Sequence, residues 1–229
     1  MTTPIPASGL SGSSSPFELQ TVVSPLFEEN AYLFALPGSR EAVVVDPGLD
    51  AEGILDCLRE HDWHLVAILN THGHADHIAG NEAMKDAFPA APLLIGEIDA
   101  PMLTDPVLNL SGLAGAPLVS PPADRLLREG DRFSFAGMDF EVLDIPGHSP
   151  GHVVFVVRVT GHAPVVFGGD VLFRGSIGRT DFPGGDHDLL IRGIHNKLFR
   201  LPPGVIVYPG HGPVTTVGHE KRTNPYCRL

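Results

Sequence analysis

The stretch THGHADH, residues 71–77, holds four potential metal ligands within six residues and follows directly on residues 65–70. Those preceding residues form a mainly apolar run, which is typical of a strand covered on both faces of its sheet. Side chains two residues apart point away from each other on a helix and lie about 6.6 Å apart on a strand. His72 and His74 can therefore converge on one ion only in a turn, and Gly73 between them favours such a turn.

The same stretch continues into a helix that we expect over residues 77–88. Asp76 and His77 would lie in or near its first turn, where they face a second point close to the first. A solvated polar loop that happens to hold three histidines is the alternative interpretation. Uncharged imidazoles buried this densely would each need a polar partner, which argues against a purely structural role.

Three more ligand-type residues stand at the ends of apolar runs, each with a glycine directly before it: His148, Asp170 and His211. Such a glycine allows the backbone to come close to a ligand or to another segment. Seven candidates are too many for one closed zinc site of four ligands, but they suit two ions with three protein ligands each and one shared carboxylate. The nitrogen and oxygen donors favour zinc, iron or manganese over copper.

The order of predicted elements is the same in both halves of the chain: strands first, then strand, helix, strand. Strands are predicted over residues 17–24, 30–36, 41–46, 65–70, 92–96, 132–136, 139–145, 153–159, 164–167 and 205–208. Besides the helix over residues 77–88, one begins after the N-cap residue Asp50 and one spans residues 186–199. This order predicts two similar half-units, with two sheets face to face and helices outside, in a four-layer α/β fold.

Length and composition indicate one globular domain, assigned to residues 17–229, after a Ser-, Gly- and Pro-rich tail over residues 1–16 that is predicted to be disordered. The net charge of −12 argues against nucleic acid and anionic lipid as partners. No apolar run approaches the roughly 20 residues of a membrane span, and no secretory signal is visible, so we expect a cytoplasmic protein. The two cysteines, Cys57 and Cys227, provide neither a disulfide framework nor a thiolate zinc site.

Charge is distributed unevenly along the chain. The part up to Asp124 has 3 basic and 17 acidic residues, whereas the part from Arg125 has 12 basic and 10 acidic residues. An anionic small molecule would be drawn to the second part, although solvated surfaces also vary in sign without a ligand. The candidate substrate-binding residues are basic residues that flank ligand-bearing segments: Arg174, Arg179, Lys221 and Arg222. Arg179 can equally fix its own loop by pairing with Asp181.

The ligand-type residues, together with the Asp46-Pro47-Gly48 turn, resemble the metallo-β-lactamase superfamily over nearly the whole chain after Phe17. The resemblance implies an αββα sandwich. Two later stretches, GDVLF to SIGRTD over residues 169–181 and GHGP to TTVG over residues 210–218, are similar to the short glyoxalase II type. Members of that type are hydroxyacylglutathione hydrolases, which cleave S-acyl thioesters.

The resemblance also implies how the seven ligands divide. One metal is expected on His72, His74 and His148, and a second on Asp76, His77 and His211, with Asp170 bridging the two. We expect divalent ions, zinc first, with iron or manganese as alternatives. A hydroxide held between two ions about 3.5 to 4 Å apart is the expected nucleophile. Asp76 and Asp170 are the catalytic candidates, Asp76 for steering or accepting a proton.

The expected substrate is a small thioester, either S-(2-hydroxyacyl)glutathione or a related acyl-thiol. A thiolate leaves readily because the pKa of a thiol is only about 8.5, so no strong general acid is required. The longer glyoxalase II type has an extra helical region that contributes to glutathione binding, whereas here only residues 215–229 follow the last ligand. Other thiol carriers therefore stay open, as does the oligomeric state.

Persulfide dioxygenase of the same superfamily is the alternative function. It would place a single iron on His72, His148 and Asp170, and its chain is also similar through residues 178–182. A metal-binding module without turnover is the non-enzymatic alternative, but the complete ligand set argues against it.

Asp46 ends an apolar strand, where its carboxylate either accepts an N–H from a metal-bound imidazole or serves only the turn. The remaining histidines are expected to be surface or structural residues: His61, His64, His152, His162, His187, His195 and His219. His152 is the one of these that stands nearest in sequence to a ligand, four residues after His148.

Overall fold

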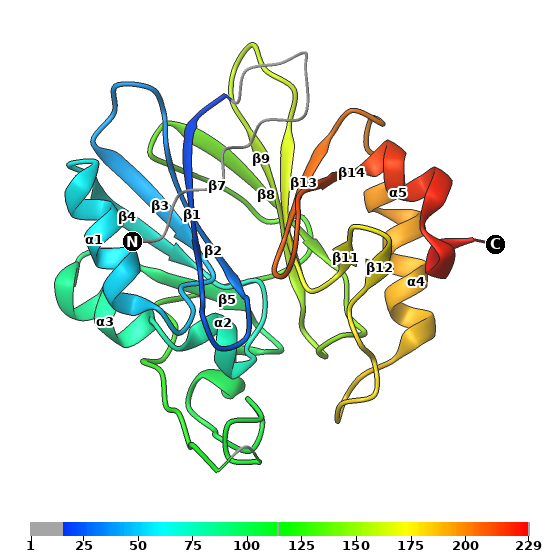
Figure 1. The fold of residues 1–229 in the computed structure, drawn as a ribbon, viewed down its shortest axis with the longest axis horizontal. Coiled ribbons are helices and arrows are strands. Elements are labelled where there is room, and N and C mark those ends of the chain that lie inside the picture. The colour runs from blue at the N-terminus through cyan, green and yellow to red at the C-terminus, as the bar shows by residue number, and fades with distance from the viewer. Residues whose placement is uncertain (1–15, 114, 229) are drawn as a thin grey trace.

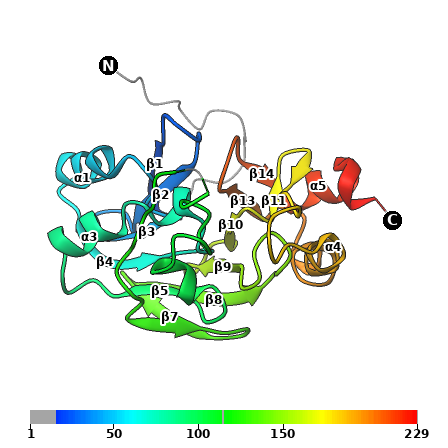
Figure 2. The ribbon, with the colours of Figure 1, turned by 90° about the horizontal axis from the view of Figure 1, so that it is seen from below.

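Two sheets pack face to face, and helices cover the outer side of each (Figure 2). The structure is a computed structural model that describes residues 16–113 and 115–228. The tail predicted over residues 1–16 therefore lies outside the described residues, apart from Pro16. The four-layer α/β arrangement predicted from the order of elements is confirmed.

The first sheet has six strands in the order β1-β2-β3-β4-β5-β6 (Figure 1). They are β1 (Glu18–Val23), β2 (Asn30–Ala35), β3 (Glu41–Val45), β4 (His64–Leu69), β5 (Leu93–Gly96) and β6 (Arg125–Leu127). The first three form an antiparallel meander, and β3 to β6 run parallel to one another.

The second sheet repeats this plan with six strands in the order β14-β13-β10-β9-β8-β7. They are β7 (Arg132–Phe135), β8 (Met138–Asp144), β9 (Val153–Arg158), β10 (Val165–Gly169), β13 (Ile206–Pro209) and β14 (Thr215–Thr216). Strands β7 to β10 form an antiparallel meander, and β13 joins β10 in parallel. Two short strands, β11 (Leu172–Phe173) and β12 (Ser176–Ile177), pair separately.

Five α-helices lie among these strands in the described part of the chain. They are α1 (Ala51–Glu60), α2 (Ala75–Ile78), α3 (Asn81–Ala87), α4 (His187–Asn196) and α5 (Val217–Thr223), with 3-10 helices η1 (Ala100–Leu103), η2 (Leu198–Arg200) and η3 (Pro225–Cys227). Asp50 caps α1 as predicted, because its carboxylate accepts a hydrogen bond from the Gly53 amide. Within the described residues, no helix is long and apolar enough to cross a membrane.

The single helix predicted over residues 77–88 is wrong, because two short helices, α2 and α3, replace it. The interruption lies at Gly80, whose amide donates to the Pro47 carbonyl at 2.7 Å. A Cβ atom at this position would lie 2.9 Å from the carbonyl oxygens of Pro47 and Gly48. The close contact with the turn after β3 thus takes the place of a continuous helix.

The core between the sheets is mainly aromatic and aliphatic. Phe34 of β2 stacks on Phe167 of β10, with ring centroids 4.5 Å apart and an interplanar angle of 11°, and Phe17 lies 5.0 Å from Phe34. The residue before Phe34 on β2, Leu33, packs on the opposite face of the sheet, in a second apolar cluster beneath α1. This alternation follows from the strand geometry and explains why β2 is buried on both faces.

Strand ends from both sheets meet at one edge of the sandwich. In the first sheet, Val45 of β3 pairs in parallel with Leu69 of β4. In the second, Gly169 of β10 pairs in parallel with Pro209 of β13. Parallel strands deliver the residues that follow them to the same edge, so the predicted ligands gather there.

Candidate metal centre

Three imidazoles form a first cluster of ligand atoms. His72 Nε2 lies 3.1 Å from His74 Nδ1, and His74 Nδ1 lies 2.9 Å from His148 Nε2. All three side chains are buried, and their ligand atoms lie within 4.8 Å of one another. The predicted convergence of His72 and His74 in a turn is therefore confirmed, and His148 joins them from the second sheet.

A second cluster combines Asp76, His77 and His211. Asp76 Oδ2 lies 3.7 Å from His77 Nε2 and 3.4 Å from His211 Nε2. Asp76 and His77 belong to α2, the first helical turn after the histidine turn, as predicted. His211 reaches them from the segment after β13, so this cluster also spans both sheets.

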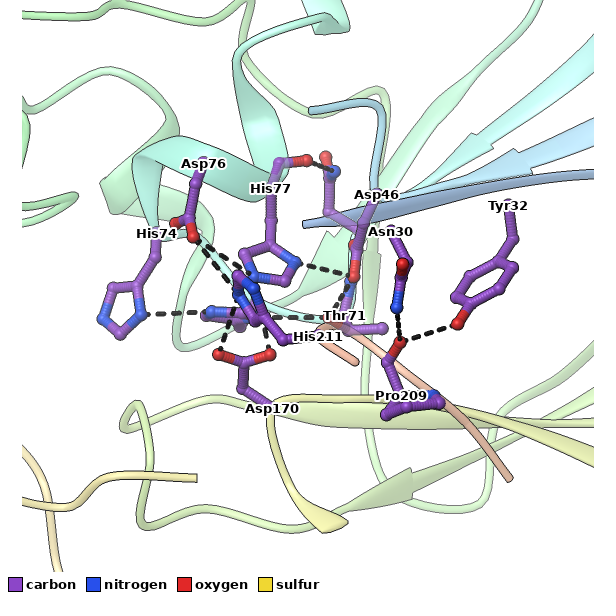
Figure 3. Close-up of polar contacts among 12 residues, drawn as sticks. Asn30, Tyr32, Asp46, Thr71, His74, Asp76, His77, Asp170, Pro209 and His211 are labelled. Atoms are coloured by element: carbon purple, nitrogen blue, oxygen red, sulfur yellow. Dashed lines mark hydrogen bonds and ion pairs between the residues drawn. The ribbon is translucent and has the colours of Figure 1, made fainter. Parts of the chain in front are cut away.

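The Asp170 carboxylate lies between the two clusters. Its Oδ2 is 3.5 Å from His148 Nε2 and 3.5 Å from His211 Nε2, while its Oδ1 is 3.5 Å from His77 Nε2. Figure 3 shows Asp170 and His211 on one side, facing His77 and Asp76 on the other. One carboxylate is thus placed to serve both groups of ligand atoms.

In His148 and His211 the ring nitrogen that points away from the clusters is hydrogen-bonded. His148 Nδ1 contacts the Arg179 carbonyl at 2.8 Å, and His211 Nδ1 contacts the Phe27 carbonyl at 3.1 Å. A carbonyl can only accept, so each of these Nδ1 atoms carries the proton and leaves Nε2 free to bind a cation. This is the arrangement that outer-shell partners impose on metal-binding histidines.

Asp46 provides the corresponding support for His77. Its Oδ2 lies 3.1 Å from His77 Nδ1 and also accepts from the Thr71 hydroxyl at 2.6 Å. Its Oδ1 accepts from the Thr71 amide at 2.7 Å. The first of the two roles predicted for Asp46, contact with an imidazole of the site, is the one the structure shows.

The buried polar atoms of the site fit a pair of cations. His77 Nε2 and Asp170 Oδ1 are both buried, and neither has a hydrogen-bond partner among the described residues. Leaving such atoms unpaired costs free energy, and their facing positions allow a cation to satisfy both. The donor set of imidazole nitrogens and carboxylate oxygens is that of zinc, iron and manganese sites.

Protonation states in the first cluster favour metal binding. Burial lowers the pKa of His72 well below its ordinary value, and the nearby His77 and His74 lower it further. Burial, together with His148, lowers the pKa of His74 to about 3. Neutral imidazole is the form that binds a metal, so these rings are prepared as ligands at neutral pH.

In the second cluster, the attraction between carboxylates and imidazoles outweighs the effect of burial on the pKa values. Burial opposes the ionised form of Asp76, but His77 and His211 outweigh burial and lower the pKa of this carboxyl. Burial likewise opposes the charged form of His77, yet Asp76 and Asp170 raise its pKa well above the ordinary value. The carboxylates therefore attract positive charge to this position, which a bound cation would supply in place of the proton.

Glycines beside the ligands permit this close assembly, as the sequence predicted. A Cβ atom at Gly210 would overlap Asp170 Oδ1 and lie 2.7 Å from His77 Cε1. Gly169 has a φ of +47°, and a Cβ atom there would lie 2.7 Å from His152 Nε2. Both positions exclude larger residues because the two ligand-bearing segments touch.

His152 belongs to the wall of the site. Its ring is fully buried and stacks on His72, with centroids 4.7 Å apart and an interplanar angle of 19°. Its Nε2 accepts a hydrogen bond from the Asp170 amide at 3.0 Å. The expected structural role thus includes holding the backbone of Asp170.

The start of β2 and the residue before it, Glu29, contribute side chains that the sequence analysis missed. Asn30 Nδ2 and the Tyr32 hydroxyl both donate to the Pro209 carbonyl, at 3.0 and 2.8 Å (Figure 3). The Asn30 amide donates to the Gly210 carbonyl at 2.8 Å. These bonds cross from the first sheet to the second and fix the segment that carries His211.

Glu29, directly before β2, is the other residue that was missed. Its side chain is fully buried, and neither carboxylate oxygen has a hydrogen-bond partner within the described residues. Burial raises the pKa of Glu29 well above the ordinary value; His77 opposes this shift and Asp46 adds to it. In the sequence it follows another glutamate in a short loop, a pattern typical of solvated side chains, so nothing there indicated burial.

The four predicted substrate-binding residues differ in their surroundings. Arg179 makes two hydrogen bonds to Asp181, both of 2.7 Å, and lies over the Phe182 ring at 3.9 Å, so it does fix its own loop. Lys221 Nζ donates to the Phe199 carbonyl at 3.2 Å. Arg174 and Arg222 are exposed. Contact of any of the four with substrate stays a prediction.

Two relatives of the chain are named as hydrolases. The chain is 38% identical over 213 residues to a probable metallo-hydrolase of Streptococcus pyogenes serotype M6, covering 91% of this chain and 90% of the relative. It is 37% identical over 202 residues to the hydroxyacylglutathione hydrolase GloC of Haemophilus influenzae, covering 87% of this chain and 93% of the relative.

Solved structures agree with the fold. The B3 metallo-beta-lactamase BLEG-1 is 41% identical with a TM-score of 0.87, covering 93% of this chain and 100% of that chain. TTHA1623 in a di-iron-bound form is 39% identical with a TM-score of 0.77, covering 90% and 99%. ETHE1 from Myxococcus xanthus is 29% identical with a TM-score of 0.72, covering 91% and 83%. The family profile of the metallo-beta-lactamase superfamily matches residues 25–211, and the chain belongs to this superfamily of metallo-hydrolases.

Proposed function

We propose that the chain is a binuclear metal-dependent thioesterase that hydrolyses S-(2-hydroxyacyl)glutathione or a related acyl-thiol. The observation that carries this proposal is the position of Asp170, whose carboxylate lies 3.5 Å from ligand atoms of both clusters. Two sets of three ligands with one shared carboxylate suit a pair of catalytic ions. The similarity to GloC of Haemophilus influenzae supports the choice of thioester substrate.

In this proposal the seven predicted ligands keep their assignment. His72, His74 and His148 would hold one ion, Asp76, His77 and His211 would hold the other, and Asp170 would be shared between them. Zinc is the first expectation, since it takes imidazole and carboxylate ligands with an open position for water. The di-iron form of TTHA1623 supports iron as the alternative metal.

When bound, two such ions lower the pKa of a coordinated water to about 7 and polarise the carbonyl of the substrate. The chain provides the geometry for this chemistry. Asp46 and the carbonyls of Arg179 and Phe27 hold three imidazoles in one orientation. Asp76 is ionised at neutral pH, because its pKa is lowered, and its Oδ2 stands between His77 and His211 where it can steer or accept a proton.

Exposure of the ligands indicates the side from which substrate approaches. The side chains of His211 and Asp76 are 26% and 22% exposed, whereas that of His77 is fully buried. The Phe173 ring lies 6.2 Å from the His211 ring, and the exposed Phe27 bonds His211 through its carbonyl. We infer that a thioester reaches the site past His211 and meets these two phenylalanines.

Two other activities have a specific observation in their favour. The likeness to ETHE1 gives some support to the single-iron persulfide dioxygenase, at a lower identity of 29%. The likeness to BLEG-1 favours β-lactam hydrolysis. A single-iron site would leave Asp76, His77 and His211 without a function, although their ligand atoms also lie within 4.8 Å of one another.

Elemental analysis of the purified protein, combined with three turnover assays, tests the proposal. The substrates are S-lactoylglutathione, a chromogenic β-lactam and glutathione persulfide with oxygen uptake as the readout. We expect two metals per chain and thioester hydrolysis that exceeds the other two activities. One iron per chain with oxygen consumption would establish the dioxygenase instead, and two metals with no thioester hydrolysis would reject the proposed substrate.

A further inference from the structure

Asp99 is a fully buried carboxylate outside the seven predicted ligands. It lies between β5 and η1, at the position directly before η1. An aspartate at such a position commonly caps its own helix, as Asp50 does for α1 and Asp186 does for α4. The Asp99 side chain makes no such cap bond. Its oxygens are turned toward other segments.

Those segments are the two loops that carry the first group of ligands. Asp99 Oδ2 accepts from the Gly73 amide at 3.3 Å and from the Ser149 hydroxyl at 2.5 Å. Asp99 Oδ1 accepts from the Gly151 amide at 2.6 Å. Gly73 lies between His72 and His74, and Ser149 directly follows His148. One carboxylate therefore ties together both backbone segments from which the first three ligands project.

The two glycines allow Asp99 to come this close. A Cβ atom at Gly151 would lie 2.5 Å from the Asp99 amide nitrogen and 2.8 Å from its Oδ1. A Cβ atom at Gly73 would overlap Met102 Cβ and lie 3.1 Å from the Asp99 carbonyl oxygen. The loops on both sides are therefore shaped to the Asp99 segment, and the contact is not a chance meeting of surface groups.

Asp99 and Asp46 support the ligands in different ways. Asp46 bonds His77 directly and thereby supports the second group. Asp99 bonds no ligand ring and acts through the main chain of the first group. Burial raises the pKa of Asp99, and the hydrogen bonds from Ser149, Gly151 and Gly73 oppose that shift. Three donors thus compensate the cost of a buried carboxylate at this position.

We propose that Asp99 is a positioning residue that holds the His72-His74 turn against the His148 loop and so sets the metal affinity of this first group alone. The inference rests on the ligand assignment of the proposed function. Outer-shell partners of a metal site typically contribute 10- to 100-fold to its affinity. Asp99→Asn keeps the size of the side chain but offers one acceptor oxygen to three donors, so an effect of about that size is expected on the first group only.

Zn²⁺ competition against a chromophoric chelator, with one metal group left intact at a time, provides the test. In a His211→Ala background, which leaves the first group, Asp99→Asn should weaken Zn²⁺ binding about 10- to 100-fold. In a His148→Ala background, which leaves the second group, Asp99→Asn should change the affinity less than about twofold. Asp124→Asn is the control, because the Asp124 carboxylate also accepts a hydrogen bond from a backbone amide, that of Leu93 at the start of β5. It should leave both affinities within about twofold.

Equal weakening in the two backgrounds would show a general structural role and overturn the inference, as would no weakening in either. If Asp99→Asn fails to fold, Ser149→Ala removes one of the three donors, and the same comparison between backgrounds decides the matter. No substrate enters these titrations, so a missing thioesterase activity would reject the proposed substrate and leave the inference standing. A native chain that binds fewer than two Zn²⁺ would instead overturn the ligand assignment and the inference with it.

Discussion

His77 Nδ1 lies 3.1 Å from the Asp46 carboxylate, while its opposite ring nitrogen, Nε2, is buried without a hydrogen-bond partner among the described residues. One nitrogen is thus fixed and the other is presented to the centre of the site. The same division, with a backbone carbonyl in place of the carboxylate, applies to His148 and His211. The orientation of these three rings thus depends on groups outside the ligand set. Substitution of the supporting residues therefore tests the site, as substitution of the ligands does.

Asp46→Asn should weaken Zn²⁺ binding by the second group about 10- to 100-fold. The Asp46 carboxylate accepts hydrogen bonds from the Thr71 amide, the Thr71 hydroxyl and His77. The side-chain amide of asparagine offers these three donors only one acceptor oxygen. Asparagine tolerates the φ of +50° at this position, so the backbone is not disturbed. Chelator competition in a His148→Ala background measures the effect. An affinity within twofold of the unsubstituted background would show that Asp46 serves only the turn.

Asp170→Asn should reduce kcat/KM for the thioester at least about 100-fold, which corresponds to about 2.7 kcal/mol of transition-state stabilisation. The reason is that this carboxylate lies 3.5 Å from a ligand atom of each group. Steady-state kinetics combined with elemental analysis measures the change, and the metal content should fall below two per chain. Activity close to that of the native protein, with both metals retained, would disprove the shared role.

Gly210→Ala should lower both the metal content and the activity. Its new Cβ atom would overlap Asp170 Oδ1, and Gly210 is not among the glycines with positive φ, so contact rather than backbone strain would be responsible. Gly204→Ala is the control, because a Cβ atom there meets nothing within 4 Å. Elemental analysis and thermal unfolding of the two variants provide the comparison. Equal behaviour of the pair would contradict the close packing at Gly210.

Phe34→Ala should lower the free energy of unfolding by about 3–5 kcal/mol. The ring is fully buried between the sheets and stacks on Phe167 at 4.5 Å. Phe27→Ala removes a ring that is 53% exposed and should change the same quantity by less than about 0.5 kcal/mol. Urea unfolding followed by circular dichroism measures both. A small effect at Phe34 would mean that the sheets are not held together by this cluster.

Lys221→Ala should raise KM for an anionic thioester and leave kcat nearly unchanged, if Lys221 contributes binding alone. The Lys221 ammonium group donates to the Phe199 carbonyl, so any contact with substrate requires it to leave that position. Parallel kinetics on a neutral and an anionic thioester isolate the contribution of charge. An unaltered KM for the anionic substrate would remove Lys221 from the binding residues.

The four-layer order of elements and the gathering of the candidate ligands at one edge could be predicted because each rests on a local pattern. The apolar run before residues 71–77 marks a buried strand, and four ligand-type residues within six positions directly after it are too dense for purely structural histidines. His148, Asp170 and His211 share a local pattern, because each follows an apolar run and has a glycine directly before it. Parallel pairing of these strands then brings residues distant in sequence to one edge.

What could not be predicted depends on contacts between distant segments. The helix expected over residues 77–88 divides at Gly80 because that residue bonds Pro47 of another loop. Asp99 resembles any aspartate before a short helix, and its bond to Gly151 joins residues 52 positions apart. Burial of Glu29 likewise follows from the packing of the two sheets, and the residues next to it in the sequence do not indicate it.

The metal content of the purified chain and of two single variants, measured by inductively coupled plasma mass spectrometry, tests the central claim most directly. Two ligand groups sharing Asp170 predict two metals in the native chain and one in each of His148→Ala and His211→Ala. One metal in the native chain that is lost in His148→Ala but retained in His211→Ala would contradict the pair of ions and leave a single site on the first group.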